Sequence, residues 1–551
     1  IPIYRLAWQS AGATPAALNM LRFLLACLVL LPPTTLMGAT LPILSAHLER
    51  RGRAAGPAGS GAGALYAANT VGAVAGTAIT GFFLLPALGM FLSAVVAAAA
   101  NLIAAGAAWY LFTRSASRPP EPLPEVAAVP AAAMDAPQAG APYPVLLIVF
   151  AISGAGALIF EVVWTRVLSL VLGSSTQAFT IMLTTFLAGL AMGSALATRL
   201  LPRITNAIQA FVLIELGAGL TAFLGVYLFA ELPYAFLKLF GAVGDSDLLF
   251  SAGRFLLAAL VMLPPTLCLG AAFPLAARAL LKRGSAVSAP VAALYTSNTV
   301  GAIIGSTAAG FLLIPVIGLQ ASLLAGCALN VAAGALLLES GRNEKPILRY
   351  GLSAALVVSL PGLVTGMPDW NGMVMTAGVY QYAPRYLSQF RSRREFLDFH
   401  AGHAQLYYKD GPTTTVSVEK RPERIDGQVN IVLSVNGKVD ASSAGDMDTQ
   451  VLLGQLPMLV ADDPRTALVI GLGSGVSAGS ALTHPLDKLT IVEIEPAILE
   501  AEGYFAHVNG RPLADPRTTV RVNDARNALL VSDDTYDVII SEPSNPWITG
   551  P

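Results

Sequence analysis

Charged residues are scarce in this sequence. Only 12% of its 551 residues are Asp, Glu, Lys or Arg, whereas 54% are hydrophobic and the mean hydropathy is +0.63. An average soluble chain carries about 25% charged residues. The 33 basic and 34 acidic residues nearly cancel, so no net charge indicates a nucleic acid or an acidic surface as the partner. The composition therefore predicts that most of the chain lies in a lipid bilayer.

Cysteine and histidine are also sparse. The three cysteines, Cys27, Cys268 and Cys327, all lie in apolar stretches, which excludes a disulfide framework and a cysteine-rich metal site. The five histidines show no metal-ligand spacing, and we expect His400 and His403 at the surface. The sequence therefore predicts neither a metal site nor a nucleic-acid site.

Long apolar stretches fill the first two thirds of the chain. A helix of about 20 residues crosses the roughly 30 Å of a bilayer core. About ten stretches reach that length, near residues 22–46, 64–87, 90–113, 145–172, 177–199, 207–230, 252–278, 291–317, 320–339 and 349–366. Between the third and the fourth, residues 114–144 are rich in Pro and Ala, which is typical of a linker.

Two segments recur within the apolar region. LPPTTLMGATLPIL at 31–44 returns as LPPTLCLGAAFPLA at 263–276, and ALYAANTVGAVAGTAITGFFLLPALG at 64–89 returns as ALYTSNTVGAIIGSTAAGFLLIPVIG at 293–318. These repeats predict a duplicated six-helix bundle. A Pro pair is expected to break the first helix of each matching segment. Duplicated bundles recur in transporters, where the binding site lies between the halves, and a role in packing alone fits the repeats as well.

The repeats and the change of composition near residue 367 predict the order of domains. The expected segments are the second half of a first membrane repeat (1–113), a linker (114–144), a second membrane repeat (145–340), a final transmembrane helix and connector (341–366), a β-rich module (367–460) and a nucleotide-binding α/β domain (461–551). Three helices of the first repeat are expected to be missing, and the sheet of the last domain is expected to be incomplete at its C-terminal end.

Few ionisable residues interrupt the apolar stretches. Glu161, Arg166 and Glu215 stand out, and a charge inside a membrane is costly and often functional. Glu161 and Arg166 are five residues apart near the end of a stretch, which fits a salt bridge or an interfacial position as well as a substrate role. Other basic residues, among them Arg199 and Arg203, gather in alternate loops, which the positive-inside rule places in the cytoplasm. The part after residue 366 is then expected on the opposite side.

The polar part of the chain predicts strands, and the first of them precede a glycine loop. Alternating residues at 413–420 and 430–439 predict strands of a small antiparallel sheet, and 448–460 has helical spacing. TALVIGLGSGVSAGSAL at 466–482 then predicts a buried strand, a G-x-G-x-G loop and the start of a helix. Small residues in such a loop let backbone N–H groups approach a ligand.

Acidic and amide side chains follow the next three predicted strands. Glu493 ends KLTIVEIEP, where an acid suits the two hydroxyls of a ribose, and Asp524 ends TTVRVND. The last strand, YDVIISEPSNPW, ends in Glu542 and Asn545. These strand ends are expected to converge on one crevice that binds a ligand containing a nucleoside. In the alternative interpretation, Glu493 and Asp524 only cap the helices that follow them.

A resemblance to a known family rests on five segments of the polar part. They are NGKVDASSAGDMDTQVLLGQLP and then, in this order, VIGLGSG, VEIEP, NDAR and YDVIISEPSNPW. They resemble the class I S-adenosylmethionine-dependent fold and, within it, the polyamine aminopropyltransferases of the spermidine synthase family. With the duplicated helices, the chain resembles bacterial proteins in which a multi-spanning membrane region is fused to a spermidine synthase-like domain. The resemblance implies a polytopic α-helical bundle, followed by a small β-rich module and a class I methyltransferase-like Rossmann domain, in the bacterial inner membrane.

The resemblance also implies roles for single residues. Glu493 would hold the ribose and Asp524 the adenine end of decarboxylated S-adenosylmethionine or S-adenosylmethionine, and Glu542 would take the proton of an attacking amine. The implied cofactor-binding residues are Gly471, Gly473, Gly475, Glu493 and Asp524, and the implied substrate-binding residues are Asn545, Asp446 and Gln450. No metal is implied.

The sequence departs from the family at the fourth strand. The usual Asp-x-x-Asp-Pro reads Glu542-Pro543-Ser544-Asn545-Pro546, and the amide of Asn545 does not pair with an ammonium group as a charge. Three functions are therefore kept: a membrane-anchored aminopropyltransferase, an S-adenosylmethionine-dependent transferase for another acceptor, and a transporter or membrane-complex subunit with a non-catalytic domain. The expected partners are the bilayer, a small amine or other acceptor, and a second copy or a membrane complex. Charge bias suggests an extracytoplasmic domain, whereas the chemistry suggests a cytoplasmic one.

Overall fold

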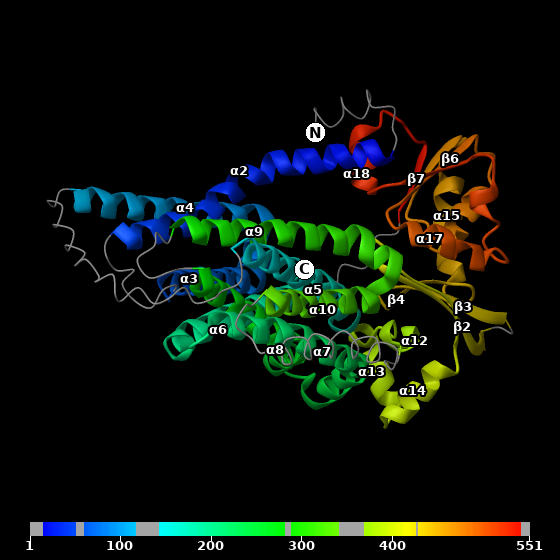
Figure 1. Ribbon diagram of the computed structural model, residues 1–551. Coiled ribbons are helices and arrows are strands. Elements are labelled where there is room, and N and C mark those ends of the chain that lie inside the picture. The colour runs from blue at the N-terminus through cyan, green and yellow to red at the C-terminus, as the bar shows by residue number, and fades with distance from the viewer. Residues whose placement is uncertain are drawn as a thin grey trace, which may run out of the picture.

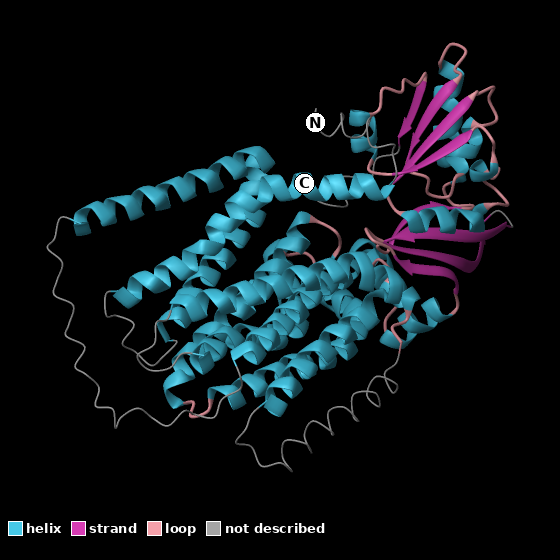
Figure 2. Cartoon of the chain, turned by 45° about the horizontal axis from the view of Figure 1, so that its top comes forward, coloured by secondary structure: helices cyan, strands magenta, loops and turns pink. Residues whose placement is uncertain are grey.

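The computed structural model describes residues 15–50, 60–116, 143–280, 288–340, 369–425 and 428–541. A bundle of long helices occupies one side of the molecule and two β-sheets occupy the other (Figure 1, Figure 2). Most of the predicted linker, the stretch at 349–366, and both Glu542 and Asn545 lie outside the described residues.

The bundle consists of nine long helices in its described part. They are α2 (Pro15–Arg50), α3 (Ser60–Ile79), α4 (Leu85–Ala116), α5 (Tyr143–Leu172), α6 (Thr176–Leu200), α7 (Ala207–Val243), α8 (Asp247–Leu280), α9 (Ser288–Ala308) and α10 (Ile314–Ser340). Short π-helical segments, Thr80–Leu84 and Ala309–Leu313, join α3 to α4 and α9 to α10. They occupy equivalent positions in the two repeats, so the duplication read from the sequence extends to an unusual backbone feature.

Seven continuous helical segments among the described residues are long and apolar enough to cross a membrane. Two of them, Gly63–Arg114 and Ala289–Glu339, contain 52 and 51 residues and each cover two of the predicted stretches. These two segments bend at Gly89 and Gly318, whose φ angles of 69° and 79° lie in the left-handed region that glycine adopts without strain. The two glycines end the same repeated segment, which is why both copies bend at the same place.

The prediction that a Pro pair breaks the first helix of each matching segment is wrong. Pro32 and Pro33 lie inside α2, and the equivalent pair lies inside α8. A proline removes only its own N–H donor, and neighbouring side chains and helices can support the turn around it. Thr34 and Thr266, which follow the pairs, each donate to the carbonyl oxygen four residues earlier at 2.7 Å.

The helices of the second repeat form a dense core. Trp164 and Phe160 of α5 are fully buried and stack with ring centroids 5.0 Å apart. Gly301 of α9 lies directly on the backbone of Ala151 of α5, and a Cβ atom there would overlap the carbonyl oxygen. Its counterpart in the first repeat, Gly72, has no atom within 4 Å of an added Cβ. The two copies therefore share a sequence but pack differently.

Three short helices, α12 (Gly372–Met375), α13 (Val379–Gln389) and α14 (Arg393–Ala401), connect the bundle to the first sheet. Trp370 anchors this segment because its Nε1–H donates to the carbonyl oxygen of Val226 on α7 at 3.0 Å. The expectation that His400 and His403 lie at the surface is wrong, since His400 is 3% exposed and the side chain of His403 is 4% exposed. Aromatic neighbours, among them Phe396, enclose the His400 ring.

The first sheet is an antiparallel meander in the order β1-β2-β3-β4. Its strands are β1 (Ala404–Asp410), β2 (Thr415–Ile425), β3 (Gln428–Val435) and β4 (Lys438–Ser442). The strand predicted at 413–420 lies largely within β2. The single strand predicted at 430–439 is wrong, because Asn436 and Gly437 form a two-residue turn with positive φ angles of 49° and 82°. Asn-Gly is the sequence that such a hairpin turn favours.

The second sheet is parallel, in the order β7-β6-β5-β8. Its strands are β5 (Thr466–Ile470), β6 (Lys488–Glu493), β7 (Thr518–Val522) and β8 (Val538–Ser541), and its helices are α15 (Met447–Val460), α16 (Val476–Ala481), α17 (Pro496–Ala501) and α18 (Ala525–Val531). The predicted strands are confirmed. This order belongs to the doubly wound α/β folds, as the sequence predicted.

The two sheets adjoin the end of the bundle at which α5 ends and α6 begins. Arg166, near the end of α5, donates to the β1–β2 loop, as described below. At the other end of the bundle, Arg278 of α8 donates to the carbonyl oxygen of Ile204 at 2.8 Å, beside Arg203. The basic loop that contains Arg203 therefore lies at the end of the bundle opposite to the sheets.

Candidate functional site

The carboxyl ends of the four parallel strands bring the predicted site segments together. Ile470 of β5 pairs with Val492 of β6 on one side and with Ser541 of β8 on the other. Glu493 pairs with Val522 of β7. The order of the strands reverses between β5 and β8, and a doubly wound sheet binds its ligand at this point. The glycine loop follows β5 at the same edge.

The glycine loop needs its glycines for two reasons. The φ angles of Gly471, Gly473 and Gly475 are 82°, 55° and 82°, a region that other residues rarely adopt. An added Cβ at Gly471 would meet no atom within 4 Å, and at Gly473 only the Cβ of Ala441 at 3.9 Å. The first part of the loop therefore faces open space, where a ligand can approach its backbone.

Glu493 is bound to the glycine loop by its carboxylate. Its Oε2 accepts a hydrogen bond from the backbone N–H of Leu472 at 2.8 Å, and its Oε1 accepts one from the N–H of Glu495 at 2.9 Å. A carboxylate offers about four lone-pair positions, so each oxygen keeps one for a further donor. The alternative that Glu493 caps the next helix is wrong, because Glu495 is the residue that accepts from Ala497 N–H and caps α17.

Asp524 does cap the helix that follows it. Its Oδ1 accepts from the backbone N–H of Asn527 at 2.8 Å at the start of α18. The preceding residue, Asn523, donates its N–H to the carbonyl oxygen of Glu493 at 2.9 Å. Asp524 therefore lies beside Glu493 at the edge of the sheet, and its role toward a ligand stays a prediction.

Asp446 and Gln450, predicted on the substrate side, lie at the start of α15. Gln450 is 5% exposed, and its Nε2 donates to Ser442 O at 2.8 Å and to Asp446 Oδ1 at 3.0 Å. Its Oε1 accepts from the hydroxyl of Ser474 in the glycine loop. Gln450 thus fixes the glycine loop against the β-rich module, and contact with a substrate stays a prediction for both residues.

The sequence analysis missed the role of Glu495. This side chain is 2% exposed, and its Oε2 accepts from the backbone N–H groups of Thr413 and Thr414 at 3.0 and 2.9 Å. An added Cβ at Gly411 would overlap its Oε1. Glu495 therefore joins the nucleotide-binding edge to the β1–β2 loop. The dipeptide Glu-Pro at the start of α17 predicts a helix cap, but no local signal indicates the long-range contact.

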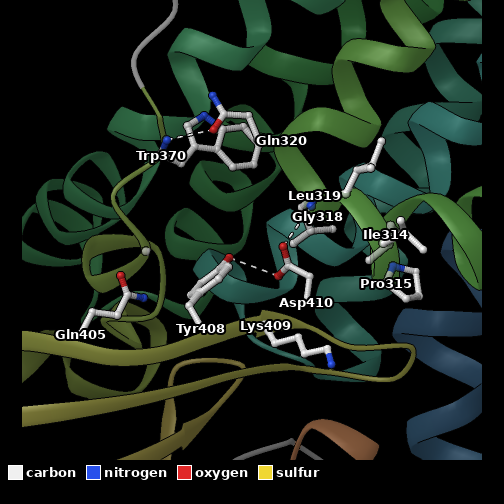
Figure 3. Close-up of a pocket in the computed structure, with 13 residues that line it drawn as sticks. Ile314, Pro315, Gly318, Leu319, Gln320, Trp370, Gln405, Tyr408, Lys409 and Asp410 are labelled. Atoms are coloured by element: carbon white, nitrogen blue, oxygen red, sulfur yellow. Dashed lines mark hydrogen bonds between the residues drawn. The ribbon is translucent and has the colours of Figure 1, made fainter.

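The same β1–β2 loop is bound to the helical bundle. Arg166 of α5 donates to the carbonyl oxygens of Gly411 and Pro412 at 3.0 and 3.2 Å. Asp410 accepts from the backbone N–H of Leu319 on α10 at 2.9 Å and from the hydroxyl of Tyr408 at 3.1 Å (Figure 3). An unbroken series of contacts therefore leads from α5 through the loop and Glu495 to Glu493. Arg166 therefore connects the bundle to the β1–β2 loop, and its position relative to a membrane interface stays a prediction.

A cavity of about 480 Å³ lies beside this junction. Figure 3 shows Trp370, Gln320 and Tyr408 among its lining residues, with the backbone N–H of Trp370 donating to Gln320 Oε1 at 2.9 Å. The cavity belongs to the junction of bundle and sheet, and not to the carboxyl edge of the parallel sheet. Among the described residues, no group of three His, Cys, Asp or Glu side chains is arranged to hold a metal ion.

Comparisons with known proteins find a family match for the segment that contains this edge of the sheet. Residues 448–550 match the Spermine/spermidine synthase domain family. The chain is 25% identical over 417 residues to a polyamine aminopropyltransferase of Corynebacterium efficiens, with 73% of this chain and 70% of that protein covered. A polyamine aminopropyltransferase of Mycobacterium tuberculosis is also 25% identical, over 420 residues, with 73% and 71% covered. Both aligned lengths exceed the 183 residues from 369 to 551, so both similarities extend into the helical region.

Other similarities cover shorter parts of the chain. A polyamine aminopropyltransferase of Streptococcus pneumoniae is 31% identical over 117 residues, which are 21% of this chain and 41% of that protein. A crystal structure of a spermidine synthase in complex with the transition state analogue AdoDATO is 19% identical, with a TM-score of 0.24 over 26% of this chain and 47% of that chain. The family match and the order of the parallel strands together indicate a spermidine synthase-like, methyltransferase-like Rossmann fold for the C-terminal part.

Proposed function

We propose that this chain is a membrane-anchored, spermidine synthase-like aminopropyltransferase that acts with a decarboxylated S-adenosylmethionine-type donor. The observation that carries the proposal is the carboxylate of Glu493, which is bound to the glycine loop at the switch point of the parallel sheet. This edge belongs to the segment that matches the Spermine/spermidine synthase domain. Similar proteins named polyamine aminopropyltransferase give further support.

The proposed reaction is a displacement at carbon. The amine nitrogen of the acceptor forms a bond to the methylene carbon next to the sulfonium, and the C–S bond breaks with both electrons passing to sulfur. The donor leaves as the neutral thioether methylthioadenosine, and the nitrogen loses one proton. Because a sulfonium is already a good leaving group, the protein needs mainly to align the reactants and to accept the proton.

The residues at the carboxyl edge take separate roles in this proposal. Glu493 accepts hydrogen bonds from the ribose hydroxyls with the lone pairs that Leu472 and Glu495 leave unused. Asp524 binds the adenine end of the donor. Glu542, the residue after the last residue of β8, accepts the proton of the amine.

Asn545 favours a second candidate function. In the proposed mechanism a carboxylate at this position would hold the cationic end of a diamine, whereas an amide offers no charge. Transfer from an S-adenosylmethionine-type donor to a less cationic acceptor is therefore the alternative. Asp446 lies on the acceptor side in both cases, half-buried at the start of α15.

Membrane anchoring rests on the seven long apolar segments. The sheets adjoin the end of the bundle opposite to the basic loop of Arg203, so the positive-inside rule favours an extracytoplasmic domain. The supply of an adenosyl donor favours a cytoplasmic one. Labelling of single cysteines, introduced on the exposed side of α18, by a membrane-impermeant thiol reagent in intact cells decides between the two.

Turnover tests the proposal. The full-length protein, purified in detergent, is incubated with the decarboxylated donor and putrescine, and both methylthioadenosine and spermidine are measured. We expect equal amounts of the two products, and a loss of about 10²- to 10⁴-fold in kcat for Glu542→Gln, the range for removal of a general base. Asp534→Asn, which removes an exposed ion pair with Arg521, serves as the control. Binding of the donor without either product contradicts the proposal.

A further inference from the structure

Glu215 is an acidic residue buried completely inside the helical bundle. It lies on α7, its exposed fraction is 0%, and neither carboxylate oxygen has a hydrogen-bond partner among the described residues. An uncompensated buried carboxylate is strongly unfavourable, and a bilayer around the bundle increases the cost. A group in this position therefore requires a bound positive charge or a proton.

Polar groups from neighbouring helices surround this carboxylate. The side chain of Ser153 approaches it from α5, and the thiol of Cys268 approaches it from α8. Asn330 of α10 is also 0% exposed, and its Oδ1 atom has no partner among the described residues. The Asn330 side chain packs against Gly156, which follows Ser153 by three residues, or about 4.5 Å along α5. Asn330 therefore contacts α5 about one helical turn from the residue that faces Glu215.

The charge of Glu215 has no protein counterpart among the described residues. No basic side chain of α5, α7, α8 or α10 forms an ion pair with it, and the neighbours that do face it are a hydroxyl and a thiol. Asn330 donates one N–H of Nδ2 to Gly326 O on its own helix at 2.9 Å, and its Oδ1 is the atom that has no partner among the described residues. The site thus offers the oxygens of Glu215, Asn330 and Ser153 without a basic side chain, and the hydroxyl of Ser153 is a neutral donor that can face the carboxylate.

We propose that Glu215, Asn330 and Ser153 form a binding site for a small cation inside the bundle, occupied by a proton or by a monovalent metal ion. Oxygen ligands suit hard cations, and a proton on the carboxyl group would supply the donor that the Asn330 oxygen lacks. A binding site at this depth gives the bundle a cation-dependent state that is separate from the chemistry at the parallel sheet.

Thermal unfolding of the full-length protein in detergent tests the site without any donor. Wild type is compared with Glu215→Gln, which keeps the shape and removes the charge, and with Glu161→Gln, which removes a partly exposed acid of α5. In choline buffer, the Tm of wild type should fall by at least about 3 °C between pH 6 and pH 9, relative to Glu215→Gln, because the carboxyl group loses its proton. Glu161→Gln should follow wild type.

Metal ions distinguish the two occupants. If sodium, lithium or potassium at equal ionic strength restores the Tm of wild type but not of Glu215→Gln, the occupant is a metal ion. If only pH has an effect, the occupant is a proton. Identical responses of wild type and Glu215→Gln to pH and to all three ions would overturn the proposal.

A second measurement uses the wild-type protein and does not depend on the folding of a variant. Dicyclohexylcarbodiimide reacts with a protonated carboxyl group in an apolar environment, and mass spectrometry locates the stable acylurea. We expect modification of Glu215 at low pH, reduced at least about tenfold at high pH or by the bound metal ion. No modification of Glu215 at any pH, or modification that neither pH nor metal ions change, contradicts the proposal.

Discussion

Two substitutions of Glu493 test its contribution to nucleoside binding and its contribution to the stability of the domain. In Glu493→Ala, the buried N–H groups of Leu472 and Glu495 both lose their acceptor. Each unpaired group costs about 1–3 kcal/mol, so the variant should lose about 2–6 kcal/mol of unfolding free energy. Glu493→Gln keeps one carbonyl oxygen and should lose only about half of that amount. Glu493→Gln is therefore the substitution that tests nucleoside binding with the smaller loss of stability.

The expected loss of affinity follows from the charge of the acceptor. Each of two hydrogen bonds from the ribose hydroxyls to a carboxylate contributes about 1.5–3 kcal/mol, and each bond to a neutral amide contributes about half, so the substitution removes about 1.5–3 kcal/mol in total. Glu493→Gln should therefore bind methylthioadenosine about 10- to 100-fold more weakly than wild type. Isothermal titration of the full-length protein gives the affinity, and thermal unfolding of the same samples gives the change in stability.

A matched control variant shows whether a loss of affinity is specific to position 493. Glu500→Gln is the same substitution on α17, but the interactions that it changes are an exposed ion pair with Lys409 and a hydrogen bond from Tyr407, so its affinity for methylthioadenosine should equal that of wild type. If folded Glu493→Gln binds the nucleoside as tightly as wild type, Glu493 does not contact the ribose, and the assignment of the crevice is wrong.

Three further predictions concern other parts of the chain. Burial lowers the pKa of His400 from 6.5 to about 4, so its neutral form contributes stability that is complete above pH 6.5 and is lost as the pH falls toward 4. Unfolding free energy should drop by about 2 kcal/mol between pH 7 and pH 5 in wild type and not in His400→Phe, measured by denaturant titration; equal pH profiles would refute this. Gly301→Ala should lower stability by about 1–3 kcal/mol, whereas Gly72→Ala, at the equivalent repeat position, should be nearly neutral in thermal unfolding; a similar loss in both would show that their packing does not differ. Arg166→Gln should weaken binding of methylthioadenosine about 2- to 30-fold through the β1–β2 loop, and Arg278→Gln, at the other end of the bundle, should not; equal titration curves for these two variants would exclude coupling through the loop.

Short-range patterns predicted the parallel sheet well. The run of buried residues before Gly471 and the acid at position 493 are local signals, because a strand, its loop and the start of a helix follow one another in the chain. The duplication of the helices could also be predicted from the sequence, because equivalent residues recur in the same order. Their bends at Gly89 and Gly318 were predicted only as the limits of separate spans.

Contacts between distant segments could not be predicted from the sequence. Nothing near Glu495 indicates Thr413, and nothing near Arg166 indicates Gly411, because these partners are 82 and 245 residues apart in the chain. The burial of His400 depends on the packing of two short helices, since aromatic residues of α13 and α14 gather around it. The Asn436-Gly437 turn, by contrast, carried a local signal that the longer apolar alternation obscured.

Calorimetric titration of the wild-type, full-length protein in detergent tests the central claim most directly. The decarboxylated donor, S-adenosylmethionine and methylthioadenosine are added separately, and putrescine follows in a second titration. The proposed aminopropyltransferase predicts binding of the decarboxylated donor and of methylthioadenosine, strengthened when the diamine is present. If folded protein binds none of the three nucleosides, the α/β domain has the fold without the chemistry, and the proposed function is contradicted.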